Sequence, residues 1–152
     1  MNMSNARAQL KAFDPNAEED GFVDQKRLSS AQEQTITKVA TWTKVRMDED
    51  SADGAKFAIV KGPCHYIFDI ALTTDPLQPG KSVMLRSVST GDDPDEVETV
   101  QPIAQFGATD SGPQHFAYSS QGWLPEGQWL RAQVNTDGPL TITKAETRVT
   151  TW

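Results

Sequence analysis

Cysteine is nearly absent from this chain, which has Cys64 alone among 152 residues. A single cysteine excludes an internal disulfide and with it the small, disulfide-stapled folds of many secreted proteins. Long hydrophobic runs are missing as well, since no stretch approaches the roughly 18 consecutive apolar residues that a membrane span needs. The first ten residues also lack the apolar core of a signal peptide. We therefore expect a protein that is made in the cytoplasm of its host and is not secreted by a signal peptide.

Positive charge is scarce too. The 14 Lys and Arg are outnumbered by 21 Asp and Glu, which gives a formal net charge of −7. Binding to nucleic acid depends on clustered cations that release counterions from the phosphate backbone, and the sequence contains no such cluster. The same reasoning applies to an anionic membrane surface. The composition predicts partners that are neither nucleic acid nor membrane.

Catalytic motifs are missing from the sequence. It contains neither a Gly-x-Ser-x-Gly elbow nor a Gly-rich phosphate loop. His115, Asp110 and a serine can be combined into a triad on paper, but any chain of this length offers such a trio. Paired carboxylates for glycoside cleavage stay open, because their separation is a property of the fold. We expect no catalytic residues, no cofactor and no enzymatic activity.

Potential metal ligands occur in three places, and none has the spacing of a metal site. The acidic segment 48–54 begins like a calcium loop, but Ala52 stands where a ligand belongs. A second acidic run, 92–96, is typical of a solvated loop tip, with weak chelation as the alternative. Cys64 and His65 are consecutive on a predicted strand, so they would point to opposite faces. We therefore expect no metal, and Cys64 is predicted to be a small buried residue.

What the sequence does contain is a series of short runs with alternating apolar residues, separated by turn residues, which is typical of β-strands. The strongest is 65–73, with Tyr66, Phe68, Ile70 and Leu72 on one face. Other strands are expected at 35–47, 56–60, 82–89, 97–106 and 114–119, followed by a closing hairpin. This series predicts an all-β fold, an antiparallel β-sandwich or jelly roll.

The closing hairpin is the clearest local pattern. The corner at 125–127 turns the chain, and Leu130, Ala132 and Val134 then alternate with polar residues. The segment 135–138, Asn-Thr-Asp-Gly, supplies residues that tolerate positive φ, and a second alternating run follows it. The pattern predicts two adjacent antiparallel strands joined by a tight turn.

Three segments of the β part resemble the tumour-necrosis-factor/C1q-like jelly roll. Residues 41–45 resemble the opening strand that precedes the first long loop of that fold. Residues 62–72 resemble its Gly-x-Tyr-x-Phe strand, in which alternate aromatics fill the core, and residues 124–134 resemble the turn into its penultimate strand. The resemblance covers roughly residues 35–150 and implies a compact homotrimer packed around a threefold axis. It implies no particular ligand.

Residues 1–34 differ from the rest, because they are polar and their apolar residues are isolated. They are predicted to form an extended, partly helical arm, with helices at 4–12 and 23–34, in front of a β-sandwich domain at 35–152. We expect the arm to dock on a partner, with a frayed tail as the alternative. The candidate docking residues are Leu10, Phe13, Phe22, Val23, Leu28, Arg7, Lys11, Lys26 and Arg27.

An acidic, cysteine-poor β domain behind a polar arm is similar in layout to bacteriophage virion proteins, including capsid decoration (cement) proteins and fibre modules. We therefore expect a trimeric structural protein of the virion that binds the major capsid protein or another virion protein. Trp123 and Trp152 are candidate subunit contacts, because aromatic residues are favoured in interfaces. The alternative is a carbohydrate-binding or receptor-binding fibre module, with Trp123, Tyr118 and His115 lining a shallow sugar site.

Overall fold

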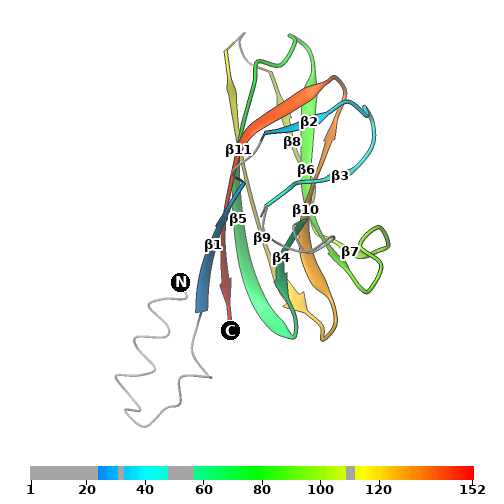
Figure 1. Ribbon diagram of the computed structural model, residues 1–152, viewed down its shortest axis with the longest axis vertical. Helices are drawn as coiled ribbons and strands as arrows, with labels where there is room; N and C mark the ends of the chain where they lie inside the picture. The colour runs from blue at the N-terminus through cyan, green and yellow to red at the C-terminus, as the bar shows by residue number, and fades with distance from the viewer. Residues whose placement is uncertain (1–23, 31–32, 48–56, 109–111) are drawn as a thin grey trace.

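The structure, a computed structural model, describes residues 24–30, 33–47, 57–108 and 112–152, and it places them in two antiparallel β-sheets (Figure 1). Sheet A has the strand order β1-β11-β5-β9, with β2 also paired to β11. Sheet B has the order β3-β10-β6-β7, with β4 also paired to β10 and β8 to β6. The strands are β1 (Asp24–Ser29), β2 (Gln34–Ile36), β3 (Thr43–Lys44), β4 (Ala58–Lys61), β5 (Cys64–Thr74), β6 (Ser82–Thr90), β7 (Val97–Val100), β8 (Ala104–Gly107), β9 (Gln114–Leu124), β10 (Trp129–Thr136) and β11 (Leu140–Thr151).

The two sheets enclose one hydrophobic core. On β5, the side chains of Tyr66, Phe68, Ile70 and Leu72 are at most 3% exposed, as their alternation predicts. The opposite sheet contributes Val83, Leu85, Leu130, Ala132 and Val134 to the same cluster. The all-β class and the β-sandwich character expected from the sequence are therefore confirmed.

The predicted closing hairpin is wrong, because its two strands do not pair with each other. β10 and β11 follow one another along the chain, but β10 pairs with β6 in sheet B and β11 pairs with β5 in sheet A. The turn between them is held by side chains, since Asp137 Oδ1 accepts a hydrogen bond from the backbone N–H of Ser82 at 2.7 Å. Alternation identifies each strand but not its sheet, because inward-facing residues look alike from either side of a sandwich.

Residues 24–36 contain strands where a helical arm was expected, so the helix predicted over 23–34 is wrong for the described residues. β1 pairs with β11 from Asp24 opposite Thr151 to Ser29 opposite Glu146 (Figure 1). β2 pairs with β11 further along its length. A polar, charged composition is typical of an edge strand, which explains why β1 resembles a tail in the sequence. The helix expected at 4–12 lies outside the described residues.

Two long predicted strands are interrupted. The run 35–47 divides into β2 and β3 around Ala40, whose φ of 54° lies in the left-handed region that strands do not use. The run 97–106 divides into β7 and β8 around Pro102, because proline cannot donate to a ladder. In the other direction, β9 continues five residues past Ser119 to Leu124.

Phe68→Ala should lower the free energy of unfolding by about 4 kcal/mol, because the Phe68 ring is fully buried and its loss leaves a cavity. Ile67→Ala is the matched control, since Ile67 is the next residue of β5 and points to the other face. Its cost should be about 1 kcal/mol. Urea denaturation measures both, and equal losses would contradict the assignment of the two faces.

Candidate interaction surface

The outer side of sheet A presents a four-stranded surface that we call the open face. Side chains alternate across a strand, so the residues opposite the inward-facing ones define it. Its members on β1 are Gln25, Arg27 and Ser29, and those on β5 are His65, Ile67, Asp69, Ala71 and Thr73. β9 contributes His115, Ala117, Ser119, Gln121 and Trp123. β11 contributes Lys144, Glu146, Arg148 and Thr150, and Trp152 follows directly after that strand. Most of these side chains are exposed or half-buried.

An aromatic cluster occupies one end of the open face. The His65 ring lies 4.7 Å from the ring of Trp123 and 5.4 Å from that of Trp152, centroid to centroid. His65 and Trp152 also exchange backbone hydrogen bonds of 3.0 and 3.2 Å, which fix the end of the chain against β5. Trp123 and Trp152 remain 54% and 41% exposed. The two tryptophans nominated separately from the sequence therefore lie in one cluster.

A polar row crosses the four strands four residues along β5 from this cluster. Arg27, Arg148, Asp69 and Ser119 are cross-strand neighbours in that order. Asp69 accepts a hydrogen bond from the Ser119 hydroxyl and pairs with Arg148 Nη2 at 3.3 Å. Among the described residues Arg27 has no carboxylate partner, and it faces Arg148 directly. This row is therefore the cationic part of the open face.

An open groove of about 720 Å³ lies beside the polar row. The side chains on its floor are short, because Ala71 and Ala117 lie opposite each other on β5 and β9. Polar side chains of the row and its neighbours border it, namely Arg27, Ser29, Asp69, Ser119, Glu146 and Arg148. The groove can receive one or two side chains or a small polar ligand.

The predicted sugar site does not form as proposed. Tyr118 is only 7% exposed, and its hydroxyl donates to the carbonyl of Pro102 at 2.7 Å inside the sandwich. His115 lies on the open face with Trp123, but eight residues along one strand separate them by about 26 Å. His115 instead contacts the Thr73 hydroxyl through Nδ1 at 3.2 Å. Alternation explains the error, because Tyr118 has the parity of the core.

The candidate docking residues of the arm are divided by the structure. Leu10, Phe13, Phe22, Val23, Arg7 and Lys11 lie outside the described residues. Lys26, Arg27 and Leu28 belong to β1. Leu28 is half-buried and packs against the hydrophobic core of its own chain, so it is not a free anchor. Lys26 and Arg27 are exposed on opposite faces of β1.

Cys64 and His65 point to opposite sides of β5, as predicted. Cys64 packs against the core, and burial raises the pKa of its thiol. No three His, Cys, Asp or Glu side chains among the described residues gather as a metal ion would require. Asp110, which could form a triad with His115 and a serine in the sequence, lies outside those residues. The acidic segment 48–54 lies outside them as well. Cys64 is therefore a packing residue in the described structure.

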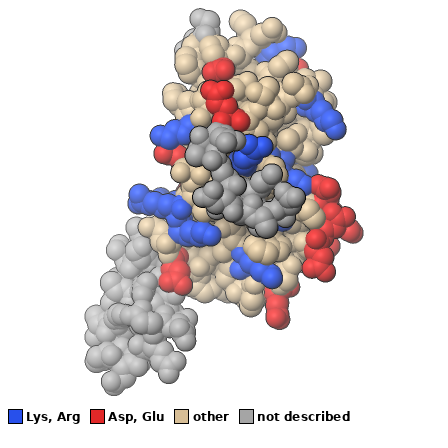
Figure 2. Space-filling model, in the orientation of Figure 1, with Lys and Arg blue, Asp and Glu red and all other residues tan. Residues whose placement is uncertain are grey.

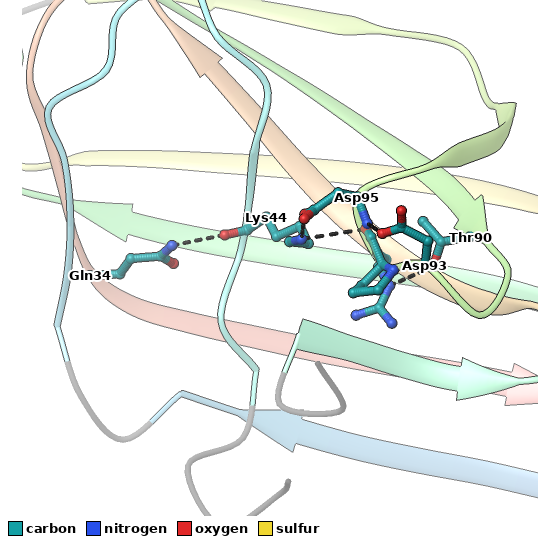
Figure 3. A network of polar contacts seen from close by, with 7 residues as sticks. Gln34, Lys44, Thr90, Asp93 and Asp95 are labelled. Carbon is teal, nitrogen blue, oxygen red and sulfur yellow. Dashed lines mark hydrogen bonds and ion pairs between the residues drawn. The ribbon is translucent and has the colours of Figure 1, made fainter. Parts of the chain in front are cut away.

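The second acidic run, 92–96, is tied to the sandwich (Figure 3). Lys44 Nζ donates a hydrogen bond to Asp95, and Asp93 Oδ1 accepts one from the backbone N–H of Asp95 at 2.9 Å. Hydrogen bonding to Lys44 and the charge of that lysine lower the pKa of Asp95 below its ordinary value of 3.8. Behind the loop, the buried Arg131 donates to Thr90 at 2.7 Å, and burial lowers the pKa of its guanidinium.

Asp95→Asn should lower the melting temperature slightly at pH 7, because the ion pair is exposed and screened by water. A carboxyl with a lowered folded-state pKa stabilises the fold above its unfolded pKa, and this contribution is lost as the pH falls through the folded value. The difference between variant and parent should therefore shrink below pH 3.8. Asp92→Asn is the control, expected to be neutral in the same melts. A difference that persists in acid would contradict the role of Asp95.

His65 and the two alanines of the groove were not recognised from the sequence as surface residues that act together. The signal was present in the odd-numbered positions of β5, which face the opposite way from Tyr66 and Phe68. The position of His65 beside Trp152 could not be predicted, because Trp152 follows β11 and lies 87 positions later in the chain.

No protein-family model and no curated protein sequence matches this chain. Within the described residues, no helix is long and apolar enough to cross a membrane. The open face and its aromatic cluster therefore carry the functional argument by themselves.

Proposed function

We propose that this chain is a structural virion protein without enzymatic activity, a trimeric decoration protein of a bacteriophage capsid. The observation that carries the proposal is the open face, with Trp123 and Trp152 exposed on either side of His65. Exposed tryptophans grouped on one surface are typical of protein–protein contacts, where they contribute much of the binding energy. The open face is the surface through which the subunits meet.

The strand order supports a jelly roll. If β1 with β2, β3 with β4, and β7 with β8 are each counted as one interrupted strand, the fold has eight strands in two four-stranded sheets. The chain then changes sheet at every connection except the one into β7, as the interleaved Greek keys of a jelly roll require. This order agrees with the resemblance to the tumour-necrosis-factor/C1q-like fold, and the trimer is inferred from that resemblance.

Charge also favours the open face as the contact. Copies of a chain with a net charge of −7 repel one another, so a self-contact needs a surface without that excess. On the open face, Asp69 and Glu146 are paired with Arg148 and Lys144, and Arg27 adds a further cation. Figure 2 shows basic and acidic side chains together at the flank where β1 lies, and a group of acidic ones at the flank of β7. Assembly through sheet A keeps the acidic flank outside.

Sedimentation equilibrium tests the trimer. Three chains of 16.7 kDa give about 50 kDa, and we expect that mass or a multiple of it. The double variant Trp123→Ala, Trp152→Ala should dissociate to smaller species with the circular dichroism spectrum unchanged. Trp42→Ala is the matched control, because Trp42 stacks on Arg86 of sheet B and should leave the mass unaltered. A monomeric parent would contradict the proposal.

Attachment to the shell is assigned to the residues before β1. A deletion should end at residue 23, since β1 belongs to sheet A and its removal would expose β11. We expect the shortened chain to keep its melting temperature and oligomeric mass but to lose binding to empty capsid shells in co-sedimentation. The full chain is the control, and equal binding of both would overturn the role of residues 1–23.

Carbohydrate binding is the second candidate function, favoured by the exposed ring of Trp123 beside His65 and Trp152. Flat aromatic rings of this kind can pack against sugar rings. Glycan-array binding that Trp123→Ala abolishes, by a protein that sediments as a monomer, would favour this function over assembly.

A further inference from the structure

β9 lies at one edge of sheet A, and its outer side pairs with no other described strand. Along the other edge, eleven consecutive residues pair with β5, from Gln114 opposite Thr74 to Leu124 opposite Cys64. No backbone group of the described residues pairs with residues 115–123 on the free side. Among the described residues, the free edge is therefore an unused hydrogen-bonding ladder over residues 115–123.

The hydrogen-bond phase of the free edge follows from one observed pair. His65 exchanges both backbone hydrogen bonds with Trp152, so odd-numbered residues of β5 bond to β11 and even-numbered ones bond to β9. The residues of β9 opposite the even ones, such as Tyr118 and Ser120, are thereby satisfied. The N–H and C=O groups of the remaining residues point outward, namely those of His115, Ala117, Ser119, Gln121 and Trp123.

The free edge lacks the features by which proteins protect exposed edges. Such edges are usually short, charged or interrupted by proline. β9 has eleven residues with no Lys, Arg, Asp, Glu or Pro. The opposite edge of the sheet, β1, has six residues that include Asp24, Lys26 and Arg27. In sheet B the edge strands β3, β4, β7 and β8 have four residues or fewer. β9 is thus the one long, uncharged edge of the described strands.

We propose that β9 pairs antiparallel with β9 of a second copy of this chain, so that two sheets A join into one. An antiparallel pair of identical strands is twofold symmetric, and it overlaps over the full strand only when its axis passes through the midpoint, Ser119. Ser119 is one of the outward-pointing residues, so this register places outward groups opposite outward groups, as a ladder requires.

Side-chain sizes fit this register. Phe116 falls opposite Gly122 of the partner subunit, and Tyr118 falls opposite Ser120 of the partner subunit. On the open face, His115 falls opposite Trp123 of the partner subunit. Each pair places a large side chain against a small one or an aromatic ring against another, which are favourable cross-strand combinations. No like charges meet anywhere along the eleven positions. A second copy therefore fits the edge better than a charged peptide would.

This contact goes beyond the proposed trimer, because it uses the edge of sheet A and a twofold axis. Sedimentation equilibrium separates the two ideas, since two chains of 16.7 kDa give about 33 kDa, three give about 50 kDa and six give about 100 kDa. A mass near 33 kDa supports the pairing without the trimer, and one near 100 kDa supports both. A mass near 50 kDa or that of a single chain overturns the pairing.

Opposed charges test the register itself. In the proposed pair, Ala117 falls opposite Gln121 of the partner subunit, so the double variant Ala117→Lys, Gln121→Lys sets like charges against each other. Its mass should fall by half, and so should that of Ala117→Glu, Gln121→Glu. Mixing the two variants in equal amounts should restore the parent mass. Gln105→Lys, on the edge strand β8 of sheet B and outside the open face, is the control and should change nothing. Failure of the mixture to re-associate would overturn this register.

Amide hydrogen exchange gives an independent readout on the unaltered protein. The N–H groups of Phe116, Tyr118 and Ser120 bond to β5 and should exchange slowly at every concentration. Those of Ala117, Ser119 and Gln121 should slow by at least about tenfold when the protein is concentrated above its dissociation constant. Equal and fast exchange of these outward groups at all concentrations would overturn the pairing.

Discussion

The rest of the structure depends on β5, which is bonded on both sides and whose side chains alternate strictly between the core and the open face. Its ladders with β11 and β9 fix the register of the central strands of sheet A. A slip by one residue would exchange Phe68 with Asp69, exposing an aromatic ring and burying a carboxylate. The free energy that holds Phe68 in the core therefore also holds Asp69 and His65 on the open face. Core and surface are specified by the same pattern.

The flanks of the sandwich differ in the polar contacts that cover them. Near β2, the Gln34 side chain donates to the carbonyl of Lys44 at 2.8 Å and accepts from the N–H of Arg46 at 2.9 Å, which ties sheet A to the start of sheet B (Figure 3). Lys44 in turn holds Asp95. Polar contacts of this kind need defined partners on both sides. Within the described part of the chain, no comparable contact lies along the outward backbone of β9, and this asymmetry favours the pairing that we propose.

Much of the fold could be predicted from the sequence, because alternation is a local property. The strand at 65–73 and its four inward residues were placed correctly, as was the opposition of Cys64 and His65. What alternation cannot supply is the partner of each strand. The pairing of β10 with β6 and of β1 with β11 depends on closing the sandwich over long sequence separations. β1 was interpreted as part of an arm because edge strands are polar.

The candidate surface was predictable only in part, for the same reason. Trp123 and Trp152 were identified as contact residues, but their meeting at His65 joins three strands that no local pattern connects. Tyr118 and Trp123 of the predicted sugar site lie five positions apart on β9. On one strand, residues an odd number of positions apart face opposite sides, so Tyr118 and Trp123 cannot share a face while β9 is regular. The sequence alone therefore places Tyr118 and Trp123 on opposite faces once both belong to one strand.

In the assembly that we propose, two features of sheet A make complementary contributions. A face supplies apolar area, which is adhesive but tolerates many relative orientations, whereas an edge supplies a hydrogen-bonded ladder that fixes one register. On this chain the exposed aromatic area and the free edge meet at Trp123, which belongs to both. On the open face Asp69 and Glu146 are paired with Arg148 and Lys144, so the carboxylates of this face are neutralised where a second copy would approach.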